Sequence, residues 1–176
     1  EWNHPDKALR CGFDMDFYLD WHGNGYSTMM RDYDYKSGCD NYIGNGSFFS
    51  RDSGSDVSRF LADYLPQYHD SREHGLWCFI TCNHDTPRPT AGLTDTERRL
   101  AFAWIFTMPG APFLYYGDEL GMDYRAIPTK EGGYHRTGSR TPMQWNAGKN
   151  LGFSEGAGED LYLPVESDAL HTVQAQ

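Results

Sequence analysis

Residues 76–85 read LWCFITCNHD, and this stretch decides the fold class. The segment from Leu76 to Cys82 is a short and nearly continuous apolar run. Such a run is typical of a strand that is buried on both faces, as the strands of parallel sheets are. It ends abruptly at the polar tripeptide Asn83-His84-Asp85. We therefore expect a buried strand that carries polar side chains at its carboxyl end.

A helix and a second strand follow this segment. Residues 94–97 (TDTE) form a capping box in front of a helix predicted over Arg98–Met108, and the Pro-Gly pair at 109–110 ends that helix. The apolar run Phe113–Tyr116 predicts the next strand. Strand, helix and strand within about forty residues make a βαβ unit, so the two strands are expected to be parallel.

The sequence before Leu76 predicts one more strand and one more helix. Apolar and polar residues alternate over Gly12–Asp20, which indicates a strand with unlike faces. After a loop-like stretch at 36–55, Asp56 can cap a helix that ends near Pro66. From Gly117 to Gln176 glycine and proline recur without a clear period. Loops of that length are usually functional or belong to something larger.

Composition narrows the class of partner. The chain of 176 residues has a net charge of −10 and is 15% aromatic. This acidic balance argues against nucleic acids and anionic membranes as partners, whereas neutral sugars fit it better. No signal peptide is visible, and no run approaches the ~18 apolar residues of a membrane span. The cysteines show no CxxC spacing, so we expect a reduced, cytoplasmic protein; they are Cys11, Cys39, Cys78 and Cys82.

The polar tripeptide allows two interpretations. A carboxylate and an imidazole at a strand end could hold sugar hydroxyls and stabilise an oxocarbenium-like transition state. The alternative is a helix-capping Asp85 beside a buried, hydrogen-bonded His84. Zinc ranks below both, because no HExxH or similar ligand spacing occurs. The pair Asp118-Glu119 could be an acid/base pair, but adjacent side chains diverge, which favours a role in ordering the loop.

Four strings together resemble the α-amylase family of glycoside hydrolases. Residues 79–88 (FITCNHDTPR) resemble the Asn-His-Asp region after that family's seventh barrel strand, and residues 108–122 (MPGAPFLYYGDELGM) resemble its eighth strand and turn. Residues 140–146 (RTPMQWN) and 152–154 (GFS) resemble the loop that follows in its α-glucosidase-like members. Their order and spacing carry the resemblance over essentially the whole chain.

The resemblance implies an α/β fold that is part of a (β/α)8 TIM barrel, covering about strands six to eight. Three strands cannot close such a barrel, which takes ~250 residues. We therefore expect residues 1–176 to be a fragment of one catalytic barrel domain. The N-terminal half of the barrel and a C-terminal β domain would then lie outside the chain.

The resemblance also implies roles for single residues. Glu1 matches the general acid/base, and Asp85 matches the third acid, which grips hydroxyls and supports the transition state. Independently, Glu1 stands beside Trp2, a setting that can raise an acid's pKa, and the alternative is a surface turn before Pro5. The expected substrate-binding residues are His84, Asn83, Arg88 and Arg140. Neither a metal nor a redox cofactor is implied.

One part of the family pattern is missing from the chain. The family's nucleophile is an Asp after Gly-x-Arg-x, and no Gly-x-Arg-x-Asp occurs here. A retaining enzyme needs two carboxyl groups ~5–5.5 Å apart, so we expect the chain alone to be inactive. The partners we expect are an α-linked gluco-oligosaccharide and the remainder of the barrel, with no nucleic acid and no membrane.

The expected function is hydrolysis of α-glucosidic bonds in short oligosaccharides by retaining double displacement. Three alternatives stay open. The first is a transglycosylase or isomerase of the same family. The second is a carbohydrate-binding or transporter-associated barrel that lost its chemistry, and the third is a small unrelated α/β binding module. A shared fold does not determine the substrate of an enzyme.

Overall fold

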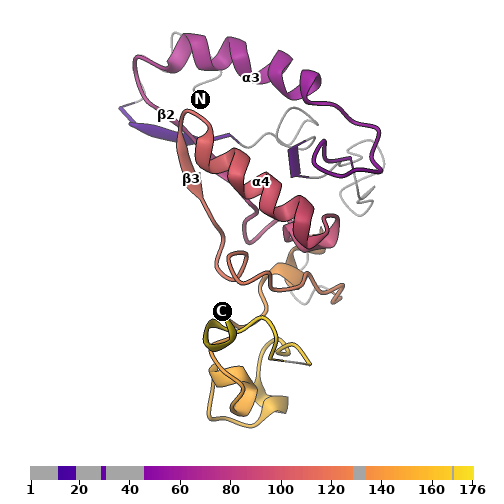
Figure 1. Cartoon of the computed structure of the whole chain (residues 1–176). Coiled ribbons are helices and arrows are strands. Elements are labelled where there is room, and N and C mark those ends of the chain that lie inside the picture. Colours follow the sequence, from indigo (N-terminus) through magenta and orange to yellow (C-terminus); the bar gives the residue numbers. More distant parts are fainter. Residues whose placement is uncertain (1–11, 19–28, 31–45, 129–133, 168) are drawn as a thin grey trace. The chain divides into compact units, whose positions relative to one another are not determined.

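The computed structural model describes residues 12–18, 29–30, 46–128, 134–167 and 169–176. The chain divides into two compact units (Figure 1). Unit 1 comprises Glu1–Thr81 and Gly92–Phe113, and unit 2 comprises Cys82–Ala91 and Leu114–Gln176. Unit 1 contains the sheet and its helices. Glu1 lies outside the described residues.

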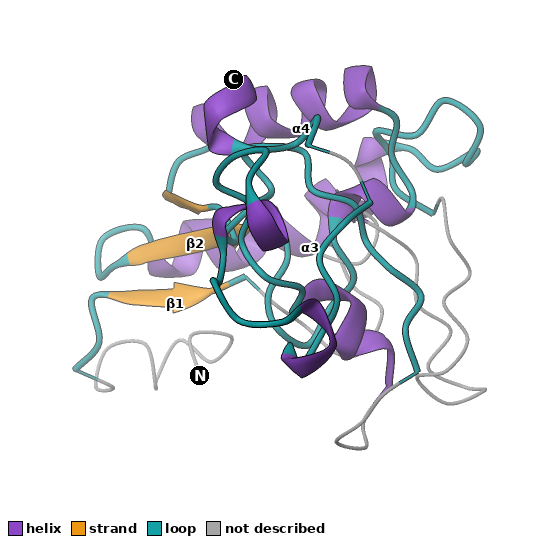
Figure 2. Cartoon of the chain, turned by 90° about the horizontal axis from the view of Figure 1, so that it is seen from below, coloured by secondary structure: helices purple, strands orange, loops and turns teal. Residues whose placement is uncertain are grey.

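The sheet of unit 1 has three described strands in the order β1-β2-β3. They are β1 (Met15–Phe17), β2 (Leu76–Ile80) and β3 (Ala111–Phe113). Both neighbouring pairs are parallel, and Figure 2 shows β1 and β2 side by side. The predicted parallel βαβ unit is confirmed.

The third strand lies earlier in the chain than predicted. It pairs Ala111 with Cys78 and Phe113 with Ile80, whereas the sequence predicted a strand over Phe113–Tyr116. Pro112 has no N–H to donate, and β3 is an edge strand of the described sheet, where proline is tolerated. The apolar run after Phe113 leaves the sheet, and its residues Tyr115 and Tyr116 belong to unit 2.

Helix α3 (Val57–Ser71) begins as predicted but continues past Pro66. Ser58 N donates a hydrogen bond to the side chain of the N-cap residue Asp56 at 2.6 Å. Proline in a helix interior removes one backbone hydrogen bond. The helix nevertheless continues to Ser71, and the rings of Tyr64 and Tyr68 stack 5.5 Å apart across the proline. The prediction that the helix ends near Pro66 is therefore wrong.

Helix α4 (Asp95–Thr107) confirms the predicted capping box. Glu97 N donates to Thr94 Oγ1 at 3.4 Å, and Thr94 N donates to Glu97 Oε2 at 2.8 Å. The other oxygen of Glu97 accepts a hydrogen bond from Arg51 N at 2.8 Å. One carboxylate thus fixes both the helix start and an earlier loop. The helix starts three residues before the predicted Arg98.

One face of the sheet packs against both helices. The Tyr18 ring lies 5.7 Å from that of Tyr64 in α3, and Tyr64 lies 5.5 Å from Phe79 in β2. The helices meet where the Phe60 ring is 6.0 Å from Trp104. Aromatic side chains make up half of the buried core of unit 1, whose members are Tyr18, Met29, Met30, Phe49, Phe60, Tyr64, Trp77, Phe79, Ile80, Leu93, Ala101 and Ile105.

The other face of the sheet is apolar and only partly exposed, because Cys78 and Ile80 of β2, which share it by register, are 2% and 4% exposed. Because side chains alternate along a strand, Met15 and Phe17 share this face with Leu76 and Phe113. Each of the four is between 42% and 49% exposed. The rings of Phe17 and Phe113 meet edge to face, 5.2 Å apart. A parallel sheet normally has both faces covered, and on this face the four side chains named above remain substantially exposed.

Unit 2 consists mostly of loops with short 3-10 turns. Its interior is unusually polar, because Arg88, Asp118, Thr141 and Gln144 are buried in it beside Met122. The turns are η2 (Pro89–Ala91), η3 (Tyr134–Ser139), η4 (Lys149–Gly152), η5 (Gly158–Asp160) and η6 (Val173–Ala175). In the described ranges of the chain, no helix is both long enough and apolar enough to cross a membrane.

Candidate active site

The tripeptide after β2 forms a hydrogen-bonded turn. The Asn83 side chain accepts a hydrogen bond from Asp85 N at 2.8 Å, and Asn83 N donates to Thr86 Oγ1 at 3.0 Å. Thr86 N donates back to Asn83 O at 3.3 Å. The backbone N–H groups of Asn83, Asp85 and Thr86 are thus all hydrogen-bonded within the turn itself. The turn fixes the backbone from which the Asp85 carboxylate projects.

The carboxylate of Asp85 lies between a guanidinium and an imidazole. Its Oδ1 is 3.0 Å from Arg140 Nη2, and its Oδ2 is 3.2 Å from His84 Nε2. Arg140 Nε also donates to the backbone oxygen of His84 at 2.8 Å. The Asp85 side chain is 33% exposed, so it is held by protein groups and still faces solvent. A half-buried carboxylate that is fixed in this way can meet an incoming polar ligand.

A buried ion pair lies beneath this cluster. Arg88 has an exposure of 0%, and its Nη1 is 2.8 Å from Asp118 Oδ1. The same nitrogen donates to the backbone oxygen of Tyr116 at 2.6 Å. The rings of Tyr115 and Tyr116 lie next to each other, with centroids 4.6 Å apart, and both lie close to the guanidinium, with centroids 5.1 and 4.9 Å from Cζ. Cys82 Sγ lies 3.1 Å from Asp118 Oδ2.

Ser139 connects this ion pair to the candidate site. Arg88 Nη2 donates to Ser139 O at 3.2 Å, and the Ser139 hydroxyl donates to Thr86 O at 2.6 Å. Ser139 precedes Arg140 in the sequence, and Thr86 follows Asp85. The buried contacts therefore hold together the two segments that carry the Arg140–Asp85 ion pair.

The structure brings together four of the residues that the sequence analysis singled out, and it buries a fifth, Arg88. Asn83, His84, Asp85 and Arg140 form a single contact network. Arg88, which the resemblance gave as an expected substrate-binding residue, is buried in the interior of unit 2. Its charge is engaged by Asp118, the carboxylate for which the sequence favoured a loop-ordering role.

The sequence analysis did not identify two residues that help to hold the candidate site together. Ser139 and Thr86 are joined by the buried hydrogen bond from the Ser139 hydroxyl to Thr86 O. Serine and threonine are common in loops of every kind, so their residue type gives no signal of such a bond. Their adjacency to Arg140 and Asp85 becomes informative only when the two segments are known to meet.

One further group of side chains could hold a cation. Ligand atoms of Asp123, Glu166 and His171 all lie within 4.8 Å of one another. Glu166 Oε1 accepts a hydrogen bond from Asp123 N at 2.8 Å, and Glu166 Oε2 is 3.5 Å from His171 Nδ1. Burial raises the pKa of the Glu166 carboxyl. The three groups already contact one another, and we assign no metal to them.

Comparison with known proteins gives a family. The family model of the α-amylase catalytic domain matches residues 53–176 of this chain. Maltase A2 of Drosophila melanogaster is 37% identical over 98 residues, which cover 55% of this chain and 17% of that protein. A probable oligo-1,6-glucosidase 2 of Bacillus subtilis (strain 168) is 33% identical over 132 residues, covering 54% of this chain and 24% of that protein.

A third relative is named as a transporter heavy chain and not as a glycosidase. The amino acid transporter heavy chain SLC3A1 of Mus musculus is 32% identical over 114 residues, covering 63% of this chain and 16% of that protein. The matched segments thus span at most 24% of the length of these three relatives. The match to the catalytic domain covers more than half of the chain, and the chain therefore belongs to the α-amylase family.

Proposed function

We propose that this chain is part of a retaining glycoside hydrolase that cleaves α-glucosidic bonds of short oligosaccharides. The observation that carries the proposal is the contact network of His84, Asp85 and Arg140, which follows a buried parallel strand in a member of this family. Two of the relatives described above are named maltase and oligo-1,6-glucosidase, and this supports the substrate class.

The proposed setting is a (β/α)8 barrel, the fold of this family's catalytic domain, with the described sheet covering about strands six to eight. Consecutive parallel strands with both crossover helices on one face are the arrangement that a barrel requires. The partly exposed apolar face with Met15, Phe17, Leu76 and Phe113 would then be the interior of the barrel. Residues contributed by the remaining strands would cover it.

Asp85 is the proposed centre of the chemistry. Its carboxylate can accept hydrogen bonds from sugar hydroxyls and stabilise the positive charge of an oxocarbenium-like transition state. His84 is 62% exposed and can contact a hydroxyl beside it. Arg140 holds the carboxylate by a charge-assisted hydrogen bond. We assign Arg88 a positioning role, because its guanidinium is buried and bound to protein groups.

The other two catalytic groups are proposed from the family pattern. Glu1 would be the general acid/base, and an Asp contributed by another part of the barrel would be the nucleophile. The chain by itself would then be inactive. General-acid catalysis alone supplies only about 10²–10⁴-fold, which is far below the acceleration that glycoside hydrolysis needs.

A carbohydrate-binding or transporter-associated barrel without chemistry is the second candidate. The similarity to a transporter heavy chain, over 63% of this chain, favours it. The two candidates differ in whether the complete protein turns over α-glucosides, because a barrel that only binds would lack the nucleophile.

The test is hydrolysis of maltose and isomaltose by the complete protein, compared with its Glu1→Ala variant. We expect hydrolysis by the unmodified protein and loss of most activity on these poor leaving groups in the variant. Activated aryl glucosides should retain more of the rate, and azide should restore turnover. No turnover by the unmodified protein would favour the second candidate. Equal loss on both substrate types, without rescue, would give the acid role to another residue.

A further inference from the structure

Asp85 lies in the middle of a short loop of unit 2 whose two ends are buried. Cys82 precedes Asp85 and Arg88 follows it, and both belong to unit 2. Cys82 is 3% exposed and Arg88 is 0% exposed, whereas the Asp85 side chain is 33% exposed. The loop 82–88 thus has an accessible tip and a buried base.

One carboxylate binds both ends of this loop. Asp118 Oδ1 accepts a hydrogen bond from Arg88 Nη1 at 2.8 Å, and Asp118 Oδ2 accepts one from Cys82 Sγ at 3.1 Å. Asp118 is itself buried, so both contacts form away from solvent. A thiol is a weak donor, but a hydrogen bond to an ionised acceptor is stronger than one between neutral groups. The two oxygens of Asp118 therefore hold the two ends of the loop together.

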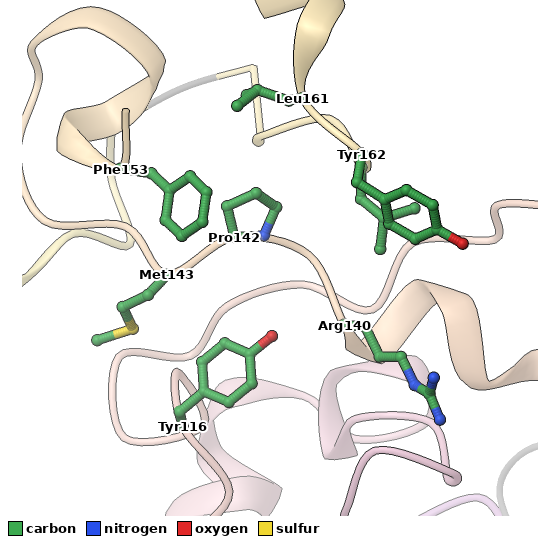
Figure 3. Close-up of a pocket in the computed structure, with 8 residues that line it drawn as sticks. Tyr116, Arg140, Pro142, Met143, Phe153, Leu161 and Tyr162 are labelled. Carbon is green, nitrogen blue, oxygen red and sulfur yellow. The ribbon is translucent and has the colours of Figure 1, made fainter. Parts of the chain in front are cut away.

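The tip of the loop is ordered by other groups. Thr86 O accepts a hydrogen bond from the Ser139 hydroxyl, and the Asp85 carboxylate is bound by Arg140. Figure 3 shows Arg140 at the edge of an open pocket that Tyr116 also lines. These contacts act after Asp85 or on its side chain, whereas the Cys82 thiol anchors the backbone that leads into the turn.

We propose that Cys82 is a positioning residue for the hydrolysis of α-glucosides. Its thiol binds Asp118 and so fixes the end of the loop that precedes Asp85. The proposal rests on the proposed function for the role of Asp85. A catalytic group that is misplaced by about 1 Å can lose about a hundredfold in rate. The Arg88 end of the loop stays bound when the thiol is removed, so the expected loss is smaller than this.

The test compares three substitutions of Cys82 in the complete protein, with kcat and KM measured on maltose. Cys82→Ala removes the thiol, Cys82→Val removes the donor but fills its space, and Cys82→Ser restores a donor. We expect kcat to fall about tenfold in the alanine and valine variants while KM changes little, because the contact of Asp85 strengthens in the transition state. The serine variant should stay within about threefold of the wild type, since a hydroxyl can donate to Asp118.

Hydrogen exchange gives a second readout that does not depend on turnover. The backbone amides of Asn83, Asp85 and Thr86 are all hydrogen-bonded within the turn. Their exchange should become at least about tenfold faster in the alanine and valine variants, because the turn opens more often once its base is loosened. It should stay near the wild-type rate in the serine variant. Unchanged exchange in α4 would show that global unfolding is not the cause.

Cys78→Ala is the matched control. Cys78 lies in β2 and is 2% exposed, so the same truncation removes the same atoms from an equally buried position. This variant should change neither kcat nor the exchange of the three amides. A loss of packing alone would affect the two alanine variants alike.

The outcomes separate the role of Cys82 from the proposed function. Unchanged exchange and kcat in Cys82→Ala, a valine variant that behaves like the wild type, a serine variant that behaves like alanine, or an equal effect of Cys78→Ala overturns the proposal. If Cys82→Ala does not fold, the comparison of valine with serine decides in the same way. If amide exchange responds as expected but the unmodified protein hydrolyses no α-glucoside, the anchoring of the loop by Cys82 stands and the proposed function falls. If hydrolysis is normal and the Cys82 variants match the wild type, the proposed function stands and the role of Cys82 falls.

Discussion

Arg140 Nη2 lies 3.0 Å from Asp85 Oδ1, although 55 positions separate the two residues in the sequence. The contact joins the loop after β2 to a loop near the C-terminal part of the chain. Arg140 Nε also binds His84 O, so one guanidinium orients both the carboxylate and the backbone that carries it. Several consequences of this contact and of the buried groups beneath it can be measured.

Replacing Arg140 by Lys should lower the kcat of the complete protein on maltose by about ten- to hundredfold. Lysine keeps the charge but cannot place two nitrogens in the fixed fork that reaches both Asp85 and His84. Hydrogen bonds to charged groups contribute about 1.5–3 kcal/mol, which sets this range. The control is Arg99→Lys, whose side chain is 79% exposed on α4. If kcat is unchanged and the protein remains folded, Arg140 does not orient Asp85.

Removing one partner of the Arg88–Asp118 ion pair should strongly destabilise the protein. Both side chains are at most 1% exposed, so Arg88→Ala would leave an unpaired buried charge at a cost of about 3–5 kcal/mol. The free energy of unfolding in urea is the measured quantity. Arg99→Ala is again the matched control, because its ion pair with Asp95 is exposed and should contribute little.

The double variant Arg88→Met with Asp118→Leu sharpens this test. It removes both charges together and should cost less than the sum of the two single changes. Additive costs would mean that the ion pair does not couple these residues.

Glu166→Gln should stabilise the protein at neutral pH and have no such effect in acid. Burial raises the pKa of Glu166, so the folded state resists ionisation of this carboxyl. The protonated Glu166 carboxyl therefore contributes stability to the folded wild type at pH values below the ordinary pKa of 4.5. This contribution is lost as the pH rises through the higher pKa of the folded state. The difference in melting temperature between variant and wild type, followed from pH 3 to pH 8, should grow with pH. A difference that is flat with pH would contradict this account.

Glu97→Gln should show the opposite dependence on pH. Hydrogen bonds from Arg51 N and Thr94 N lower the pKa of Glu97. Its carboxylate therefore stabilises the folded state above the ordinary pKa of 4.5, and this stability is lost as the pH falls through the lower folded value. The variant should melt earlier than the wild type at pH 7, and the gap should close in acid. Glu159→Gln, at an exposed position, is the matched control.

Local signals in the sequence predicted the elements of unit 1 well. The buried strand at Leu76 and the capping box at Thr94 depend on neighbours within a few residues, and both are present. The predicted boundaries of these elements were wrong where contacts between residues far apart in the sequence determine them. Tyr115 and Tyr116 were predicted as part of a strand, but their rings contact Arg88 instead. Helix α3 continues past Pro66, where the rings of Tyr64 and Tyr68 stack.

The candidate site was predictable in part. Motif order identified Asp85, His84 and Arg140, which the structure brings into contact. The burial of Arg88 and the bond from Ser139 to Thr86 could not be predicted, since each depends on two loops folding against each other. The left-handed turn at Asn150 was not predicted either, because asparagine and glycine are common in loops of every kind and Leu151 is a residue type that rarely adopts positive φ.

The most direct test of the account is the steady-state kinetics of Asp85→Asn in the complete protein with maltose as substrate. Asparagine keeps the shape of the side chain and removes the charge that would stabilise an oxocarbenium-like transition state. We predict that kcat falls by at least about a hundredfold while KM and the melting temperature change little. An unchanged kcat with an effect confined to KM would contradict the role of Asp85 in the transition state.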